Sequence, residues 1–148
     1  MAMEIRTTRF GSVSIDPGDI LLFPDGLPGM EDCRHWVLLA DTQNDCLGWL
    51  QSTTHPEFAL AVVSPRRFVS DYRVRVFRTE MVPLQLRNVQ EAQVLVIVNK
   101  SGPTLTVNLN APLLFNIGRR LGRQVVVNDG QPLQFAISPK HAQLRKSA

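Results

Sequence analysis

The apolar residues of this 148-residue chain come in short runs, and this spacing restricts the fold more than any other feature. Each run is about four to seven residues long and is bounded by Gly, Pro, Asn or Asp, as is typical of β-strands separated by turns. Ten runs at nearly even spacing favour a barrel or a sandwich. The runs are Ile20 to Phe23, Trp36 to Ala40, Leu47 to Leu50, Phe58 to Val63, Arg73 to Phe77, Val94 to Val98, Thr104 to Leu109, Pro112 to Phe115, Gln124 to Val127 and Leu133 to Ile137.

The runs differ in pattern, and the patterns predict different strands. Charged and apolar residues alternate from Arg73 to Phe77, so Val74 and Val76 are expected on one face of a strand and the arginines on a solvated face. The runs Phe58 to Val63 and Val94 to Val98 are continuously apolar. We expect both to be central strands that are buried on both faces.

Helix is expected to be scarce, because ten prolines and nine glycines leave few uninterrupted windows. The two best windows, Val89 to Gln93 and Ile117 to Leu121, allow a turn or two each. No repeat, linker or low-complexity stretch divides the chain. We therefore expect an all-β, antiparallel-rich single domain of about ten short strands over residues 1–139, and a basic tail, residues 140–148, that frays.

The chain is expected to be cytoplasmic. Residues Met1 to Phe10 show no apolar signal-peptide core, and no apolar run is long enough to span a membrane. In a reducing compartment Cys33 and Cys46 are expected to be free thiols, with a disulfide between them as the alternative. Together with His35 and His55 they would supply four soft ligands, but the gaps are irregular and contain no CxxC or HxxxH. We predict no metal and no cofactor.

No catalytic motif is present. The sequence contains no GxSxG, GxxxxGK[ST], GxGxxG or HExxH, and its three histidines lie in ordinary contexts. No nucleophile is paired with a recognisable base. We predict that the protein is not an enzyme.

The charges are distributed unevenly along the chain. Residues 1–60 carry nine acidic residues and three arginines, whereas residues 61–139 carry four acidic and ten basic residues. Acidic and basic residues are equal in number before residue 140, so the folded body is close to neutral. If the two halves separate in space the protein has two poles of opposite sign, which would steer partners; if they interleave, this signal vanishes.

An RNA-binding β-barrel module is the alternative hypothesis. Arg73 and Arg75 on one strand face, with other arginines between Arg66 and Arg78, could form a basic stripe, and Tyr72 could stack on a base. However, charged residues on the solvent face of a strand usually serve solvation. A near-neutral body also attracts phosphate weakly, so direct nucleic-acid binding is the less favoured interpretation.

The segment Pro24 to Gly29 predicts two consecutive tight turns, which we call the knuckle. Pro24 and Pro28 have the turn-favouring position, with Gly two residues or one residue later. Phe23 and Leu27 either pin the knuckle on the core or belong to a rigid recognition element, which would lose little entropy on docking.

The segment Asn108 to Asn116 interrupts an apolar stretch with three asparagines, and we call it the bend. Buried amides need hydrogen-bond partners, so the asparagines either tie down the bend internally or face a ligand. Pro112 cannot donate to a central ladder, which places the bend at a sheet edge or at a bulge. An open edge there could accept a partner strand.

The order of these motifs resembles the FliW family over about nine-tenths of the chain. Individually each motif is weak, but their order and spacing are specific. Two departures are Met30, where the family usually has Phe or Leu, and the segment Gln134 to His141, which lacks the family's usual ending. The matching pieces are Thr8 to Gly11, Ile20 to Gly29, Trp36 to Leu39, Trp49 to Ser52, Pro56, Phe58 to Val63, Asp71 with Tyr72, Val94 to Val98, Asn108 to Pro112, Asn116, and Gly122 to Val126.

The resemblance implies a cytoplasmic all-β pseudo-barrel that acts in flagellum assembly without catalysis. Members of the family bind the translational regulator CsrA and relieve its repression of flagellin translation. They also bind flagellin, so that secretion of flagellin frees them to bind CsrA. We accordingly expect protein partners and predict a partner-binding surface comprising Asn108, Asn110, Pro112, Asn116, Pro24, Leu27, Pro28 and Tyr72.

Overall fold

The computed structural model describes residues 2–137, so the predicted tail, residues 140–148, lies outside it. The described chain is mostly strand with one short helix, α1 (Arg78–Met81), and four 3₁₀ turns, Pro17–Asp19, Pro65–Arg67, Val82–Leu84 and Val89–Glu91. The strands are β1 (Met3–Thr7), β2 (Gly11–Ile15), β3 (Leu21–Leu22), β4 (His35–Ala40), β5 (Gly48–Ser52), β6 (Ala59–Val63), β7 (Gln93–Ser101), β8 (Thr104–Val107), β9 (Leu113–Asn116), β10 (Leu121–Gln124) and β11 (Phe135–Ile137).

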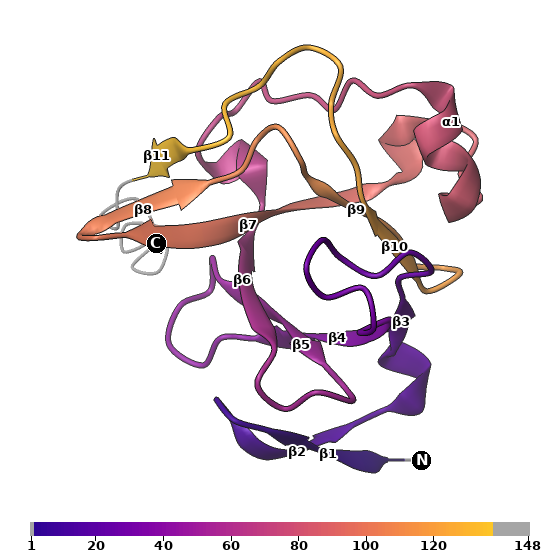
Figure 1. The fold of residues 1–148 in the computed structure, drawn as a ribbon, viewed down its shortest axis with the longest axis vertical. Coiled ribbons are helices and arrows are strands. Elements are labelled where there is room, and N and C mark those ends of the chain that lie inside the picture. The colour runs from indigo at the N-terminus through magenta and orange to yellow at the C-terminus, as the bar shows by residue number, and fades with distance from the viewer. Residues whose placement is uncertain (1, 138–148) are drawn as a thin grey trace.

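Seven strands close into a barrel, which confirms the predicted all-β pseudo-barrel (Figure 1). Their order is β7, β6, β5, β4, β3, β10, β9, and the pairing of β9 with β7 completes the ring. Every pair in the ring is antiparallel except β3 with β10, which meet in parallel at Leu22 and Leu121. Strands β8 and β11 extend the sheet beyond the ring.

A hairpin of β1 and β2 forms a separate two-stranded sheet below the barrel (Figure 1). Ile5 and Ile15 are buried in it and pack on Val37 of β4. Beside them, the guanidinium of Arg9 lies 4.2 Å from the ring centroid of Trp49. The apolar runs did not predict this hairpin, because its strands alternate polar and apolar residues and only one side meets the barrel.

The barrel interior is built around three aromatic side chains that are fully buried, Phe23, Trp36 and Phe115. The ring of Phe23 meets that of Phe115 edge-on at 5.7 Å and that of Trp36 at 6.4 Å. Gly122 of β10 leaves the room that the Phe23 ring fills, because a Cβ at residue 122 would overlap that ring. The seam between β3 and β10 therefore depends on a large ring next to a glycine.

Of the two predicted helical windows, one contains a single helical turn and the other contains none. Residues 117–120 form the turn between β9 and β10, and Arg120 has the left-handed φ of 56° there. Val89 to Gln93 contains only one 3₁₀ turn, which is held by a capping box between Asn88 and Glu91. Helix α1 and the 3₁₀ turn after it were not predicted, because Pro83 masks the apolar positions that face the core.

Two strand predictions also need correction. Arg73 to Phe77 is extended and Val74 and Val76 do face the core, yet the segment has no ladder partner and is a loop. Strand β10 ends at Gln124, so the predicted strand from Gln124 to Val127 begins where the observed strand stops. Both segments make isolated backbone hydrogen bonds, Asn128 N–H to the Arg75 carbonyl at 2.7 Å and Val125 N–H to the Pro112 carbonyl at 3.0 Å, but not the regular ladder of a strand.

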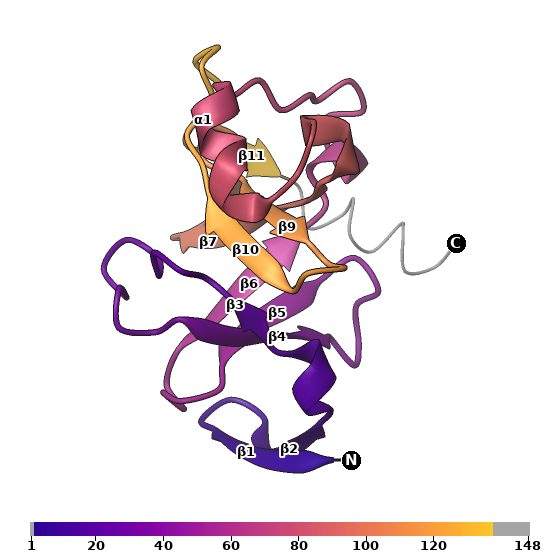
Figure 2. The same ribbon diagram turned by 90° about the vertical axis from the view of Figure 1, so that its right-hand side faces the viewer.

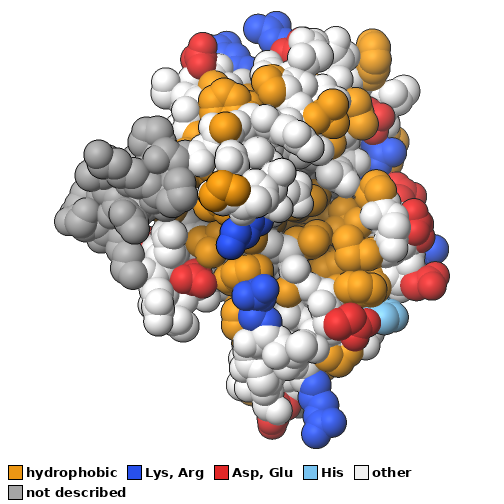
Figure 3. Space-filling model, turned by 60° about the vertical axis from the view of Figure 1, so that its left-hand side comes forward, with side chains coloured by type: hydrophobic (Ala, Val, Ile, Leu, Met, Phe, Trp, Pro, Cys, Tyr) orange, Lys and Arg blue, Asp and Glu red, His pale blue; other side chains and the backbone are white. Residues whose placement is uncertain are grey.

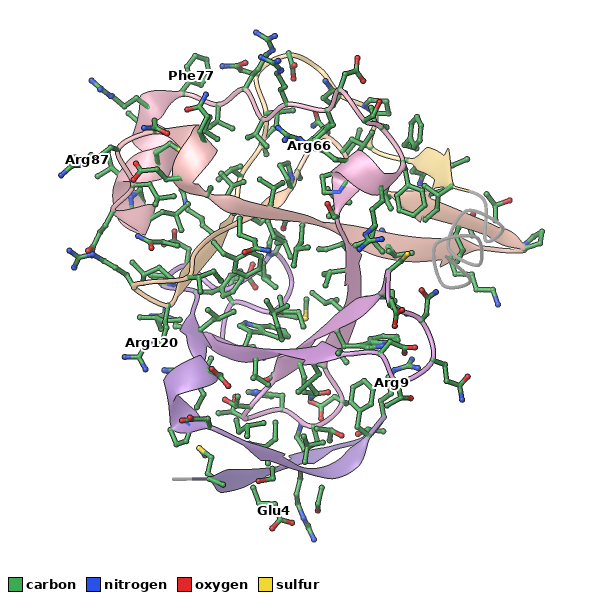
Figure 4. The ribbon with its side chains drawn as sticks, turned by 180° about the vertical axis from the view of Figure 1, so that it is seen from behind. Glu4, Arg9, Arg66, Phe77, Arg87 and Arg120 are labelled. Atoms are coloured by element: carbon green, nitrogen blue, oxygen red, sulfur yellow. The ribbon has the colours of Figure 1, made fainter. Side chains whose placement is uncertain are left out.

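The two halves of the chain separate along the long axis of the molecule (Figures 1 and 2). Residues 2–63 build the lower half, with the hairpin and β3 to β6, and residues 64–137 build the upper half. The charge asymmetry of the sequence therefore becomes an acidic lower half and a basic upper half. Figure 4 shows Arg66 and Arg87 around the upper half and Glu4 at the bottom of the hairpin, while Arg120 lies lower, beside the turn Pro17–Asp19, and Arg9 lies in the lower half.

We predict that Gly122→Ala lowers the melting temperature by several degrees. The added methyl group collides with the Phe23 ring, and overpacking of a core costs about 1–3 kcal/mol. Gly118→Ala is the control, because residue 118 lies in the exposed turn and a Cβ there meets nothing closer than 3.7 Å. Thermal unfolding followed by circular dichroism measures both, and equal melting temperatures would contradict the proposed packing.

Candidate protein-binding surfaces

The bend is a bulge in a nearly continuous strand made of β8 and β9. Both strands pair with β7, and the register changes between the pair Val98 and Val107 and the pair Leu95 and Leu113. Between these two pairs β7 advances by three residues, from Val98 to Leu95, while the opposite strand advances by six, from Val107 to Leu113. The prediction from Pro112 of an edge or a bulge is confirmed as a bulge.

Asn108 holds the bulge from within. Its Oδ1 accepts hydrogen bonds from the backbone N–H groups of Asn110, at 3.0 Å, and Ala111, at 3.1 Å. The hydroxyl of Tyr72 donates to the Leu109 carbonyl at 2.7 Å. These bonds satisfy backbone groups that the extra residues remove from the ladder, and unsatisfied buried groups of this kind are costly.

The segment after β10 covers the outer side of the bend. The backbone N–H groups of Val125 and Val127 donate to the carbonyls of Pro112 and Asn110, at 3.0 and 2.9 Å. The Pro132 carbonyl accepts from the Leu109 N–H at 2.9 Å. The edge is therefore occupied, and the expectation that a partner strand could add at the bend is wrong.

Among the three asparagines of the bend, only Asn110 has a side chain that is free to reach a partner. The Asn116 amide donates to the Leu84 carbonyl at 2.8 Å and accepts from the Arg119 N–H at 3.3 Å. Asn108 is the internal cap described above. The Asn110 amide is half-buried and makes no hydrogen bond to another residue within 2–137.

The knuckle has the two predicted turns. The Gly26 N–H donates to the Phe23 carbonyl at 2.9 Å, and the Met30 N–H donates to the Leu27 carbonyl at 2.8 Å. Gly29 has a φ of 81°, as a second central turn residue requires. Leu27 is buried and pins the knuckle on the core, while Pro28 is exposed.

One arginine ties the knuckle to α1, and the sequence did not single it out. Arg123 of β10 forms an ion pair with Glu80 of α1 and another, at 3.3 Å, with Asp25 of the knuckle. Its guanidinium also donates to the Glu80 carbonyl at 3.0 Å. The only feature of the sequence that pointed to this role of Arg123 was a charged residue inside a strand. Such residues are usually solvated, so the ion pairs were not predicted.

The eight predicted contact residues do not form one surface. Tyr72 and the Asn108 end of the bend lie together, whereas Asn116 lies across from Leu121, next to β3 and the knuckle. Three members are buried in the core and have almost no surface to offer, namely Leu27, Tyr72 and Pro112. The members with exposed surface are Pro28, and to a smaller extent Pro24, Asn108, Asn110 and Asn116.

Three arginines of the proposed RNA stripe border a broad cleft of about 1110 Å³, namely Arg66 in a 3₁₀ turn and Arg73 and Arg75 in the loop after it. Arg66 donates to the Tyr72 carbonyl at 3.0 Å, and Arg75 lies 3.7 Å from the carboxylate of Asp129. Asp71 and Glu91 also line the cleft. Because the cleft carries both signs of charge, it is a poor match for a phosphate backbone.

The described residues offer little for metal chemistry. Within residues 2–137 no three His, Cys, Asp or Glu side chains come together as a metal site would require. Cys33 and Cys46 are free and buried, and burial raises the pKa of the Cys33 thiol. Among the same residues, no helix has both the length and the hydropathy that a membrane span needs.

Comparison with known proteins identifies the family to which the chain belongs. A sequence model of the FliW protein matches residues 4–137. This chain belongs to the FliW family. The flagellar assembly factor FliW of Bdellovibrio bacteriovorus is 39% identical over 129 residues, which are 86% of this chain and 74% of that protein. The flagellar assembly factor FliW of Geobacter sulfurreducens is 34% identical over 127 residues, 84% of this chain and 79% of that protein.

A crystal structure of the flagellar assembly factor FliW has the same fold. It superposes with a TM-score of 0.83 at 26% sequence identity, over 93% of this chain and 99% of that chain. The FliW resemblance seen in the sequence is therefore confirmed, and so is the barrel architecture that it implied. The relatives of this chain are named flagellar assembly factors.

We predict that Asn108→Ala lowers the melting temperature by several degrees, whereas Asn110→Ala changes it by no more than about two degrees. The first substitution leaves two backbone N–H groups of the bulge without acceptors, at about 1–3 kcal/mol, while the second removes no hydrogen bond within residues 2–137. Thermal unfolding of both variants checks this. Equal destabilisation of the two would show that Asn110 is also part of the scaffold.

The single tyrosine provides a pH test of the bend. Burial, with a smaller contribution from Asp129, raises the pKa of Tyr72 to about 12. The folded state thus holds the phenol proton more tightly than the unfolded chain, in which the pKa is about 10. The contribution of Tyr72 to stability is complete below pH 10 and falls between pH 10 and 12, by about 1.4 kcal/mol per pH unit.

The absorbance of tyrosinate reports this group directly, because no other tyrosine is present. A midpoint near 12 in the folded protein is expected. Tyr72→Phe lacks this titration. Between pH 10 and 12 its unfolding free energy should therefore fall less steeply than that of the wild type, by about 1.4 kcal/mol per pH unit less. A midpoint near 10 while the protein is still folded would contradict the buried hydrogen bond to Leu109.

Proposed function

We propose that this FliW-family protein is a non-catalytic, cytoplasmic assembly factor that binds flagellin and the translational regulator CsrA. While flagellin is abundant in the cell the protein is occupied by it. When flagellin is secreted, the freed protein binds CsrA and relieves its repression of flagellin translation. The observation that carries the proposal is membership of the FliW family over residues 4–137.

The charge distribution supports a regulator as one of the partners. An RNA-binding regulator needs a basic surface to hold phosphates. The lower half of this chain carries nine acidic residues against three arginines in residues 1–60, and Figure 1 places this half together at one end. An acidic pole of this kind accelerates encounter with a basic partner and lowers its affinity for the wrong ones.

We assign the predicted contact residues to two roles. Asn110, Pro24 and Pro28 are proposed to touch a partner, since each has exposed surface on a rigid turn or bulge. Little conformational entropy is lost when such elements dock. The remaining members hold these surfaces in place; they are Asn108, Pro112, Asn116, Leu27 and Tyr72.

The test is calorimetric titration of the purified chain with flagellin and with CsrA from the same organism. We expect one-to-one complexes with at least one of them, and for Asn110→Ala at least tenfold weaker binding, about 1.4 kcal/mol, at an unchanged melting temperature. Asn99→Ala is the matched control, because this amide is exposed on β7 and pairs with Thr106 of β8, outside the bend. Absence of binding to both proteins would refute the proposed function, and equal binding by Asn110→Ala would refute only the site.

A further inference from the structure

Residues 73–77 run extended beside the broad cleft but leave most of their backbone groups unused, and we call this segment the cleft edge. Within residues 2–137 none of its N–H groups donates a hydrogen bond. Two of its carbonyls accept one each, that of Arg75 from the Asn128 N–H at 2.7 Å and that of Phe77 from the Glu80 N–H at 2.9 Å. An extended segment with so many free backbone groups is a template for pairing with another chain.

The direction of the backbone points the free groups of Val74 and Val76 toward the cleft. Consecutive residues of an extended chain direct their N–H and C=O groups to opposite sides. Arg75 faces Asn128, which does not border the cleft, so Val74 and Val76 face the other side. The side chains of both valines pack on the core, which holds the cleft edge extended before any partner binds.

The opposite wall of the cleft has a second incomplete edge, at the start of β7. Residues 93–95 pair with β9 on one side, but on the other side the pairing with β6 begins only at Val96, opposite Val63. The chain after β6 turns away at Pro65 into a 3₁₀ turn, and proline has no N–H for a ladder. The first two residues of β7 border the cleft, so both of its walls offer extended backbone.

The cleft has the size for an extended peptide. Its volume of about 1110 Å³ lies above the range of about 300–1,000 Å³ that is usual for small molecules. Residues 73–77 span about 16 Å at about 3.3 Å per residue. In Figure 4 Arg66, which borders the cleft, lies between the upper loop and β7.

Free backbone groups select a strand as the occupant. Hydrophobic side chains gather on the surface right of centre in Figure 3, but an apolar area alone does not select one kind of partner. A wall of extended backbone with unpaired N–H groups does, because only a strand can satisfy them in sequence.

The charges at the cleft indicate the sign of the peptide. Three exposed arginines border it, against the two acidic residues Asp71 and Glu91. The Glu91 carboxylate already accepts hydrogen bonds from two backbone N–H groups. Arg73 forms no ion pair within residues 2–137, and the Arg75 side chain is 65% exposed at 3.7 Å from Asp129. The excess of available positive charge favours a peptide with acidic side chains.

We propose that the cleft edge binds an extended, acidic peptide segment of a partner protein, which adds as a β-strand along Val74 and Val76. Side chains opposite the valines then face the core, and those opposite Arg73 and Arg75 face solvent and the guanidinium groups. This inference rests on the proposed function only in requiring a protein partner. It places strand addition at residues 73–77, where the backbone is free, and not at the bend, where the edge is occupied.

The probe is a synthetic seven-residue peptide with alternating Val and Glu, and its counterpart carries Lys in place of every Glu. Fluorescence anisotropy with the full chain should show binding of the Glu peptide at least tenfold tighter than binding of the Lys peptide. Arg73→Glu should reverse this preference. Arg34→Glu makes the same change of charge at an exposed position that does not border the cleft, and it should leave the preference unchanged.

Backbone pairing has a readout of its own. An added strand uses the N–H groups of alternate residues, so N-methylation of the Glu peptide at one alternate set should weaken binding at least tenfold, and N-methylation at the other set should not. The bound peptide should also slow hydrogen exchange of the Val74 and Val76 amides at least tenfold in NMR spectra. Equal effects of the two methylated peptides, or unchanged exchange at both amides, would overturn the proposal.

Two other occupants would give different results. Tighter binding of a single-stranded oligouridylate than of the Glu peptide would make the cleft a nucleic-acid site. A dimer in sedimentation that Arg73→Glu dissociates, without binding of the Glu peptide, would mean that the cleft edge pairs with a second copy of this chain. Either result overturns the proposal.

The same measurements separate this inference from the proposed function. If the wild-type chain binds neither flagellin nor CsrA, the proposed function fails while the peptide measurements still decide the cleft edge. If it binds both, Arg73→Glu affects neither and the two peptides bind equally, only the cleft edge is refuted.

Discussion

The structure depends on the pairing of one long strand, β7, with three others. Its first residues pair with β9, its middle with β6 and its last residues with β8. A single straight partner could not serve both ends of β7, and the bend at Asn108 provides the extra residues that let β8 and β9 follow it. The seven-stranded ring closes only through this shared strand. Because closure buries Leu113 and Phe115, the polar contacts of the bulge support the apolar core.

The two kinds of surface on this molecule have different physical origins. The acidic and basic poles arise from the order of charges in the chain, which the fold preserves because its two halves stay apart (Figure 2). The partly exposed apolar side chains around the barrel interior arise from geometry, since they pack on the buried cluster without being fully covered. Charge guides a partner over a distance of about the Debye length, whereas an apolar surface acts only on contact. The FliW fold of this chain thus combines a charge distribution that attracts partners of one sign at long range with an apolar surface that stabilises a complex only on contact.

Most of the fold could be predicted from the sequence, because run length and turn residues report the local conformation of nearly every strand from Trp36 to Ile137. The errors fall where local pattern and pairing are independent. Residues 73–77 alternate as a strand does but form no strand ladder, and β1 and β2 alternate weakly yet pair with each other. The knuckle and the bulge were recognisable because Pro and Gly carry their own conformational restrictions.

The candidate contact surfaces were less predictable, because they depend on which positions the folded chain leaves uncovered. Leu60 and Val62 have the same period and the same chemistry in the sequence, yet Val62 is buried and Leu60 is not. The difference depends on which other segments cover each position in the folded barrel, and the local sequence does not contain this information. The asparagines show the same limit, since the two-residue spacing of Asn108 and Asn110 predicts one face of a strand, but both lie in the bulge and only Asn108 accepts hydrogen bonds from its backbone.

The parallel seam between β3 and β10 has a consequence for how the chain folds. Most other pairs join strands that follow one another in the chain, whereas this seam brings together Leu22 and Leu121 through a single bridge. Closing so long a loop is entropically slow, so we expect the seam to form late. Until then Phe23 lacks its place beside Gly122 and the aromatic interior is open to other chains. The concentration at which refolding is attempted should therefore decide the yield of native protein, through competition between ring closure and aggregation.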